Sequence, residues 1–177
     1  MRIKANNIYI MGFMCVGKTK IGKRLAIRLN YKFVDTDDCI VNEAGMSIPE
    51  IFKKEGESAF RSLEKKWVAK VSKQKHQVVS LGGGAVIDPD NWECITASGI
   101  TVNLSYPPEI ILRRATLKTD RPLLNQETEA EKLDYIERLL NERKCFYQRA
   151  DVIIHLNKEI KPDLVADMIA GYLGVWQ

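Results

Sequence analysis

The sequence predicts an α/β fold in which helices cover both faces of a parallel sheet, so that the domain has three layers. Short apolar runs rich in β-branched residues recur at 8–11, 78–81, 100–104 and 152–156. Each run is too short for a helix but suits a buried strand. Stretches with helical spacing separate these runs. Because strand and helix alternate, we expect the strands to run parallel and ligands to bind beyond their carboxyl ends.

Three stretches show the spacing of amphipathic helices, with charged residues on the opposite face. The buried faces that this spacing predicts are Ile21, Leu25 and Leu29; Leu133, Ile136 and Leu140; and Leu164, Met168 and Tyr172. Residues 38–66 are mostly helical in composition and are preceded by one short strand, Phe33-Val34, which indicates an inserted substrate-binding flap. Residues 115–127 lack periodicity and contain a proline, which predicts a lid loop.

The composition is that of one globular domain spanning residues 1–177. Apolar residues make up 45% of the chain, and the net charge of +4 is too small and too evenly spread to indicate a nucleic-acid partner. No stretch approaches the ~20 apolar residues of a membrane span. The four cysteines stand far apart without metal-ligand spacing, which is typical of reduced thiols. We therefore expect a cytoplasmic protein without a membrane partner.

A glycine-rich motif follows the first apolar run and precedes the first helix. Residues 12–19 read Gly-Phe-Met-Cys-Val-Gly-Lys-Thr and match the pattern GxxxxGK[ST] without a gap. Such a loop points its N–H groups at phosphate oxygens, and the helix that follows adds the positive end of its dipole. Lys18 would reach the β- and γ-phosphates, and the Thr19 hydroxyl would take a Mg²⁺ position. The alternative is a structural turn.

The loop alone does not name the acceptor of the phosphoryl group, because GTPases, motors and small-molecule kinases share it. The chain has no Asn-Lys-x-Asp motif of the kind that reads a guanine base, and it is short for a motor. A small-molecule kinase is favoured.

Two carboxylates are expected beside the phosphate loop. Asp35 and Asp37 follow an apolar pair and are predicted at the carboxyl end of a strand, where side chains at i and i+2 share a face. One could support the metal ion, while the other accepts a proton from a hydroxyl nucleophile. The alternative is a solvated turn with a helix cap at Asp37 or Asp38.

Arginines and glycines form the remaining candidate site. Arg61 and Arg143 lie on predicted helices, where they could grip a carboxylate or could be surface charges. The three glycines 82–84 close a strand, which indicates either a ligand against the backbone or a tight turn. Arg121 lies in the irregular loop, where it could cover the transferring phosphoryl group or remain solvated. Arg114 could stack on adenine.

Together these segments resemble the shikimate kinase family over nearly the whole chain. The motifs that carry the resemblance follow in order: Gly-x4-Gly-Lys-Thr, Phe-Val-Asp-Thr-Asp, Phe-Arg-x2-Glu, Leu-Gly-Gly-Gly-Ala, Arg-Pro-Leu-Leu and Glu-Arg-x3-Tyr. The resemblance implies a five-stranded parallel sheet of the nucleoside monophosphate kinase type, a substrate-binding region at residues 36–65 and a lid at residues 115–127. It also implies a monomeric enzyme of the chorismate pathway that uses ATP and Mg²⁺ to phosphorylate the 3-hydroxyl of shikimate.

The resemblance also implies a role for individual residues. Asp37 would bind the ring hydroxyls and assist deprotonation, Lys18 and Arg121 would contact the transferring phosphate, and Thr19 and Asp35 would serve the metal. The residues expected to bind shikimate are Asp37, Arg61, Gly82, Gly83, Gly84 and Arg143. The residues expected to bind the nucleotide are Gly12, Met14, Cys15, Val16, Gly17, Lys18, Thr19, Lys20, Arg114 and Arg121.

The chain departs from this family at three positions of the loop. Many members have glycine and serine where this chain has Cys15 and Val16, and a second Ser or Thr where it has Lys20. If position 15 needs a positive φ, a β-carbon there would cost roughly 1 kcal/mol or more. The competing interpretations are a kinase for gluconate or a nucleotide, and a regulatory protein that has lost the reaction.

Overall fold

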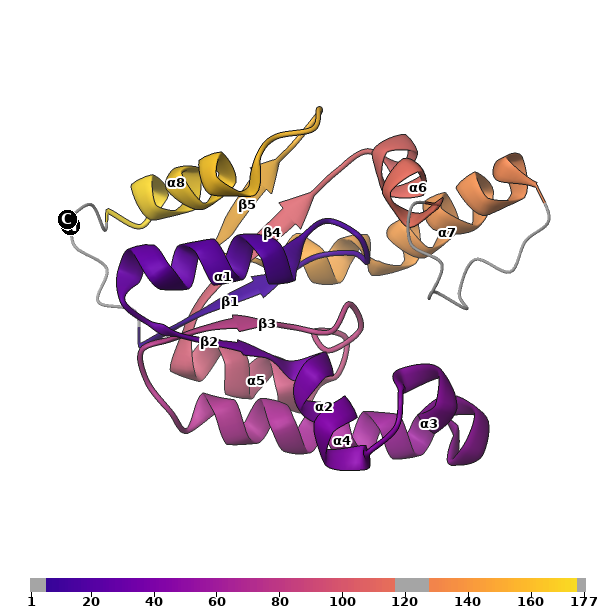
Figure 1. Cartoon of the computed structure of the whole chain (residues 1–177), viewed down its shortest axis with the longest axis horizontal. Coiled ribbons are helices and arrows are strands. Elements are labelled where there is room, and N and C mark those ends of the chain that lie inside the picture. The colour runs from indigo at the N-terminus through magenta and orange to yellow at the C-terminus, as the bar shows by residue number, and fades with distance from the viewer. Residues whose placement is uncertain (1–5, 117–127, 175–177) are drawn as a thin grey trace.

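The computed structural model describes residues 6–116 and 128–174. The strands are β1 (Asn7–Met11), β2 (Lys32–Asp35), β3 (Gln77–Ser80), β4 (Gly99–Ser105) and β5 (Val152–His155). The helices are α1 (Lys18–Leu29), α2 (Thr36–Ala44), α3 (Ile48–Lys54), α4 (Gly56–Ser72), α5 (Pro89–Ser98), α6 (Pro108–Thr116), α7 (Glu129–Tyr147) and α8 (Pro162–Tyr172). Figure 1 shows this alternation along the chain.

The strands form one parallel sheet in the order β2-β3-β1-β4-β5. The predicted α/β fold with a five-stranded parallel sheet is therefore confirmed. β1 lies in the middle and is buried along its whole length, with Tyr9 opposite Val79 on one side and Thr101 on the other. Chain order reverses at β1, so the loop that follows it lies at the switch point where open α/β sheets bind ligands.

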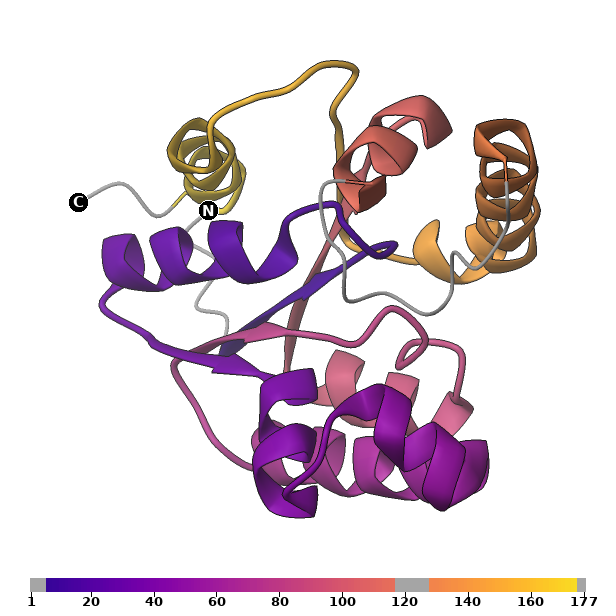
Figure 2. The same ribbon diagram turned by 45° about the vertical axis from the view of Figure 1, so that its right-hand side comes forward.

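Helices cover both faces of the sheet. α1 and α8 lie together over one face, and α4 and α5 lie over the other, while α6 and α7 pack on each other near the carboxyl ends of β4 and β5 (Figures 1 and 2). α1 is closed by its C-cap Asn30, whose N–H bonds to the carbonyls of Ala26 and Ile27 and whose φ of 52° turns the chain out of the helix. Its predicted buried face of Ile21, Leu25 and Leu29 is confirmed.

Residues 36–65 are helical, as the composition indicates, and carry a small apolar cluster of their own. Ile40, Ile51 and Phe60 join α2, α3 and α4 in this cluster, apart from the main core around the sheet. Ser47 caps α3 in a reciprocal capping box with Glu50. The region follows the end of β2 and packs around this small apolar cluster.

The predicted buried face of α8 is wrong. Leu164, Met168 and Tyr172 are 55%, 40% and 68% exposed. The residues that are buried instead are Val165, Ala166, Ile169, Ala170 and Leu173. This face is wider and includes two alanines, so α8 can lie close to α1. Arg28 on α1 then reaches two carboxylates on α8, which fixes the rotation of the helix.

In α7, only Ile136 of the three predicted apolar residues is fully buried, and Leu133 and Leu140 are half-buried. The predicted lid begins too early, because Ala115 and Thr116 still belong to α6. The rest of the lid, with Arg121, lies outside the described residues. Within residues 6–116 and 128–174, no helix is both long and apolar enough to cross a membrane.

The packing of α8 predicts opposite results for two neighbouring residues. Ile169 is fully buried against the core, so Ile169→Ala should lower the free energy of unfolding by about 2–4 kcal/mol. Met168→Ala, on the exposed face, should change it by less than about 0.5 kcal/mol. Urea denaturation followed by circular dichroism measures both. Equal losses would show that α8 is rotated differently about its axis.

Candidate active site

The phosphate loop connects β1 to α1 and takes its shape from residues with positive φ. Gly12, Cys15 and Gly17 have φ angles of 134°, 61° and 94°. A β-carbon on Gly12 would stand 2.5 Å from the backbone oxygen of Leu104 on β4, so the position needs glycine for space as well as for φ. Lys18 donates from Nζ to the carbonyl oxygens of Gly12 and Phe13, both at 2.9 Å, and so reaches across the loop.

Asp35 connects α1, the helix that follows the phosphate loop, to α2. Its Oδ2 accepts a hydrogen bond from the Thr19 hydroxyl at 2.7 Å, and its Oδ1 accepts one from the Asp37 backbone N–H at 3.1 Å. Asp35 is therefore the N-cap of α2, and Asp37 lies in the first helical turn. The prediction that Asp35 and Asp37 share one face of a strand is wrong, because β2 ends at Asp35. Both nevertheless line the same cavity as Lys18.

The glycines 82–84 form tight turns that site side chains approach closely. Ala85 N–H donates to the Gly82 carbonyl at 3.1 Å, and Ile87 N–H to that of Gly84 at 3.0 Å. A β-carbon on Gly82 would lie 2.7 Å from Asp37 Oδ1, and one on Gly84 would lie 2.7 Å from Arg61 Nη1. Both alternatives raised by the sequence thus apply in part: the segment is a turn, and its backbone is closely approached.

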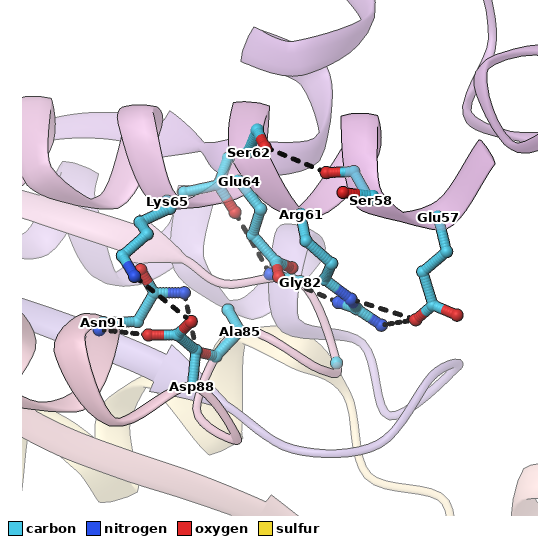
Figure 3. Close-up of polar contacts among 12 residues, drawn as sticks. Glu57, Ser58, Arg61, Ser62, Glu64, Lys65, Gly82, Ala85, Asp88 and Asn91 are labelled. Carbon is cyan, nitrogen blue, oxygen red and sulfur yellow. Dashed lines mark hydrogen bonds and ion pairs between the residues drawn. The ribbon is translucent and has the colours of Figure 1, made fainter. Parts of the chain in front are cut away.

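Arg61 lies between two carboxylates of its own helix (Figure 3). Its Nη2 is 3.0 Å from Glu57 Oε1, and its Nη1 is 2.8 Å from Glu64 Oε2. Glu64 is 1% exposed, and its Oε1 has no hydrogen-bond partner among the described residues. Burial raises the pKa of Glu64, although Arg61 opposes the shift. Sequence reasoning gave Glu64 no role; its spacing of three from Arg61 on a helix was the available signal.

Arg143 approaches the glycines from α7, on the other side. Its guanidinium lies 5.7 Å from the centre of the Phe13 ring, and its Nη1 would be 3.7 Å from a β-carbon on Gly83. One helical turn later, the buried Tyr147 donates its hydroxyl to the Gly83 carbonyl at 2.8 Å. Burial raises the pKa of that phenol. Arg61 and Arg143 therefore flank the glycine segment, as a clamp for an anion would require.

Arg114 lies against the outside of the phosphate loop. Its Nη1 donates to the carbonyl oxygens of Cys15 and Val16, at 3.3 and 3.2 Å, and its guanidinium lies over the Tyr106 ring with Cζ 4.0 Å from the ring centre. Glu159, in the connection from β5 to α8, pairs with it. Hydrogen bonds from Arg114, with help from Arg113, lower the pKa of Glu159 to about 2.

These elements enclose a cavity of about 610 Å³ at the carboxyl ends of β1, β2 and β3, a size usual for small-molecule sites. The predicted site residues that line it are Met14, Cys15, Val16, Gly17, Lys18, Thr19, Lys20, Asp35, Asp37, Gly83 and Arg114. Gly12, Gly82, Gly84, Arg61 and Arg143 do not line it but border it through the contacts above. Arg121 is outside the described residues.

Known proteins resemble this chain in sequence and in fold. The shikimate kinase family model matches residues 14–173. The chain belongs to the shikimate kinase family. The shikimate kinase of Caldanaerobacter subterraneus is 40% identical over 167 residues, covering 94% of this chain and 96% of that protein. The corresponding protein of a Synechococcus species is 43% identical over 173 residues, covering 97% and 84%.

Solved shikimate kinases have the same fold. The enzyme of Acinetobacter baumannii, determined in complex with shikimate, superposes with a TM-score of 0.87 at 34% identity, covering 96% of this chain and 94% of that one. The enzyme of Aquifex aeolicus superposes with a TM-score of 0.80 at 35% identity, covering 95% and 96%.

Cys15 meets the condition stated from the sequence, since its φ is 61°. Cys15→Gly removes the steric cost of a β-carbon at positive φ, about 1–2 kcal/mol, but it also raises the entropy of the unfolded chain, which costs roughly 0.5–1 kcal/mol of stability. The free energy of unfolding should therefore rise by about 0–1.5 kcal/mol. Cys15→Val, with a branched β-carbon, should lower it by about 1–2 kcal/mol. Urea titration compares the three proteins, and a valine variant as stable as the parent would contradict the strained loop.

Proposed function

We propose that this protein transfers the γ-phosphoryl group of ATP to the 3-hydroxyl of shikimate, giving shikimate 3-phosphate and ADP. The observation that carries the proposal is the meeting of three kinds of group at one edge of the sheet. A phosphate loop, a carboxylate at Asp37 and a glycine segment flanked by Arg61 and Arg143 come together there. The family's name and the shikimate bound to a relative agree with this assignment.

The loop would hold the phosphates of the nucleotide. Its backbone N–H groups and the α1 dipole supply positive potential, and Lys18 adds a full charge that can leave the carbonyls of Gly12 and Phe13 for phosphate oxygens. Mg²⁺ would be served by Thr19 directly, with Asp35 in support. A hydroxyl and a carboxylate oxygen, 2.7 Å apart here, are oxygen ligands of the kind this ion prefers. When bound, it would neutralise phosphate charge.

Shikimate would lie between the glycine segment and α2. Its carboxylate suits the two arginines, since a planar guanidinium can donate two parallel hydrogen bonds to a carboxylate. Gly83, where an added β-carbon would meet nothing closer than 3.7 Å, would leave room for the ring against the backbone. Glu64 would hold Arg61 in place from behind through the 2.8 Å bond. Arg114 remains a proposed neighbour of adenine, and Arg121 a proposed contact of the transferring phosphoryl group, both by family resemblance.

The reaction is a single in-line displacement. The shikimate hydroxyl oxygen forms a bond to the γ-phosphorus as the bond from that phosphorus to the β–γ bridging oxygen breaks, and ADP leaves. The hydroxyl proton passes to Asp37. Rate is gained by positioning and charge neutralisation, and no phosphoenzyme forms.

The direct test measures the release of ADP from MgATP in a coupled assay, with shikimate, quinate or gluconate offered separately as the acceptor. We expect release with shikimate to exceed release with the other two by at least about 100-fold, because a site built for one polar acceptor leaves buried groups unpaired with another. Faster release with gluconate would assign a different acceptor. Binding of ATP with no release from any acceptor would favour a regulatory protein.

Asp37→Asn tests the proposed base. Turnover should fall about 100-fold or more, since general-base assistance contributes that much, while the dissociation constant for ATP changes little. Asp38→Asn is the matched control, because Asp38 is the next residue on α2 but does not line the cavity. Steady-state kinetics and calorimetry separate the two effects. Turnover that survives in Asp37→Asn would rule out its role as base.

A further inference from the structure

We propose that Glu159 is a positioning residue for the phosphate chain of the nucleotide, acting through Arg114 on the peptide groups of the phosphate loop. The inference rests on the proposed nucleotide site and adds to it a residue that lies in a different part of the chain, in the connection between β5 and α8. Four groups carry the argument: Glu159, Arg114, Tyr106 and the loop carbonyls that Arg114 contacts.

Arg114 is held on three sides. Its Nη1 donates to the carbonyl oxygens of Cys15 and Val16 at 3.3 and 3.2 Å, and the Tyr106 ring lies under its guanidinium with Cζ at 4.0 Å. Its side chain is 18% exposed. The third side faces Glu159. A guanidinium has five donors in a fixed planar fork, so it can serve the two loop carbonyls and both oxygens of a carboxylate at once.

Glu159 fixes the orientation of that guanidinium. Both of its carboxylate oxygens accept from Arg114 Nε, at 3.0 and 3.1 Å, and Oε2 also accepts from Nη2. Arg113 donates from Nη2 to Oε1 at 2.9 Å and so holds the carboxylate from the other side. Because these bonds lower the pKa of Glu159 to about 2, the pairing is complete above the ordinary carboxyl range and is lost only as the pH falls toward 2. The pairing of Glu159 with the two arginines is therefore complete at neutral pH.

The carbonyl contacts determine where the loop's N–H groups point. In a planar trans peptide the C=O and N–H bonds point in opposite directions. Arg114 holds the carbonyls of Cys15 and Val16 toward itself, so the N–H groups of Val16 and Gly17 point away from it. Loops of this pattern bind phosphate oxygens with inward-pointing N–H groups. A guanidinium outside the loop thus keeps phosphate donors aimed inside it.

This chain has a particular need for such a hold. Cys15 has a φ of 61°, in a region that a residue with a β-carbon avoids. Rotation about the N–Cα bond of Cys15 toward a negative φ would release the strain, but it would also carry the Cys15 carbonyl and the N–H of Val16 away from their present directions. The bonds from Arg114 oppose that turn, and Glu159 keeps Arg114 in the geometry that makes them. Since Glu159 is itself 45% exposed, its pairing contributes little to folding stability, and its effect should appear in ligand binding.

The test is Glu159→Gln in the full chain, with affinities for ATP and for inorganic tripolyphosphate measured by calorimetry in the presence of Mg²⁺. Tripolyphosphate has the phosphate chain but no base. Loss of a charged hydrogen-bond partner should weaken both ligands by a similar factor, about three- to tenfold, with the melting temperature unchanged within about 2 °C. Asp163→Asn is the matched control. It also pairs with two arginines, Arg24 and Arg28, but touches no residue of the loop.

A second readout separates positioning from general support of the fold. In a Cys15→Gly background the loop is no longer strained, so Glu159→Gln should weaken tripolyphosphate binding by a smaller factor than it does in the parent. A loss confined to ATP would mean that Glu159 acts on the adenine rather than on the phosphates, and it would overturn the proposal. Unchanged binding of both ligands, or equal losses of affinity in Asp163→Asn, would overturn it as well. Neither ligand requires shikimate turnover, so these outcomes stand apart from the proposed phosphorylation of shikimate.

Discussion

Both oxygens of the Asp35 carboxylate are engaged, and the rest of the site depends on this. One accepts from the Thr19 hydroxyl on α1, and the other caps α2 through the Asp37 backbone N–H. A single side chain, 8% exposed, therefore sets the distance between the helix that follows the phosphate loop and the helix that carries the proposed base. Thr36, the next residue, extends the joint by bonding the Ser80 carbonyl and the Gly82 N–H. The donor half and the acceptor half of the site are thus fixed to each other before either ligand binds.

Two arginines of the site, Arg61 and Arg114, are paired with glutamates of the protein itself. Arg61 is held by Glu57 and Glu64 of its own helix, α4. Arg114, on α6, is held by Glu159 from the connection between β5 and α8. Such pairs are poor sources of stability when they are exposed, but they keep long side chains in one orientation. Glu64 shows the cost of this arrangement, because burial raises the pKa of its carboxyl group even beside an arginine. Glu57, Glu64 and Glu159 thus orient the arginines of the site.

Local sequence predicted those features that depend on local backbone geometry. The phosphate loop was predictable because its glycines and lysine occupy fixed offsets between an apolar run and a helix, and the strands because buried parallel strands are continuously apolar. The buried face of α8 was not predictable in this way. The large apolar residues at 164, 168 and 172 suggest burial, but contact with α1 buries the neighbouring residues, which include two alanines. The helical position of Asp37 was missed because it depends on a cap made by Asp35. Glu64 was missed because its importance comes from burial against a distant turn.

The crowding around Gly82 and Gly84 bears on how such a site can change in evolution. Asp37, Glu64 and Arg61 fill the space that any other residue at these positions would need. A substitution at either glycine therefore requires the end of one of these side chains to shift, and a shorter side chain at position 37, 61 or 64 would leave space beside the glycines. Substitutions within this set should therefore be epistatic, because the effect of each depends on the residue that stands opposite it.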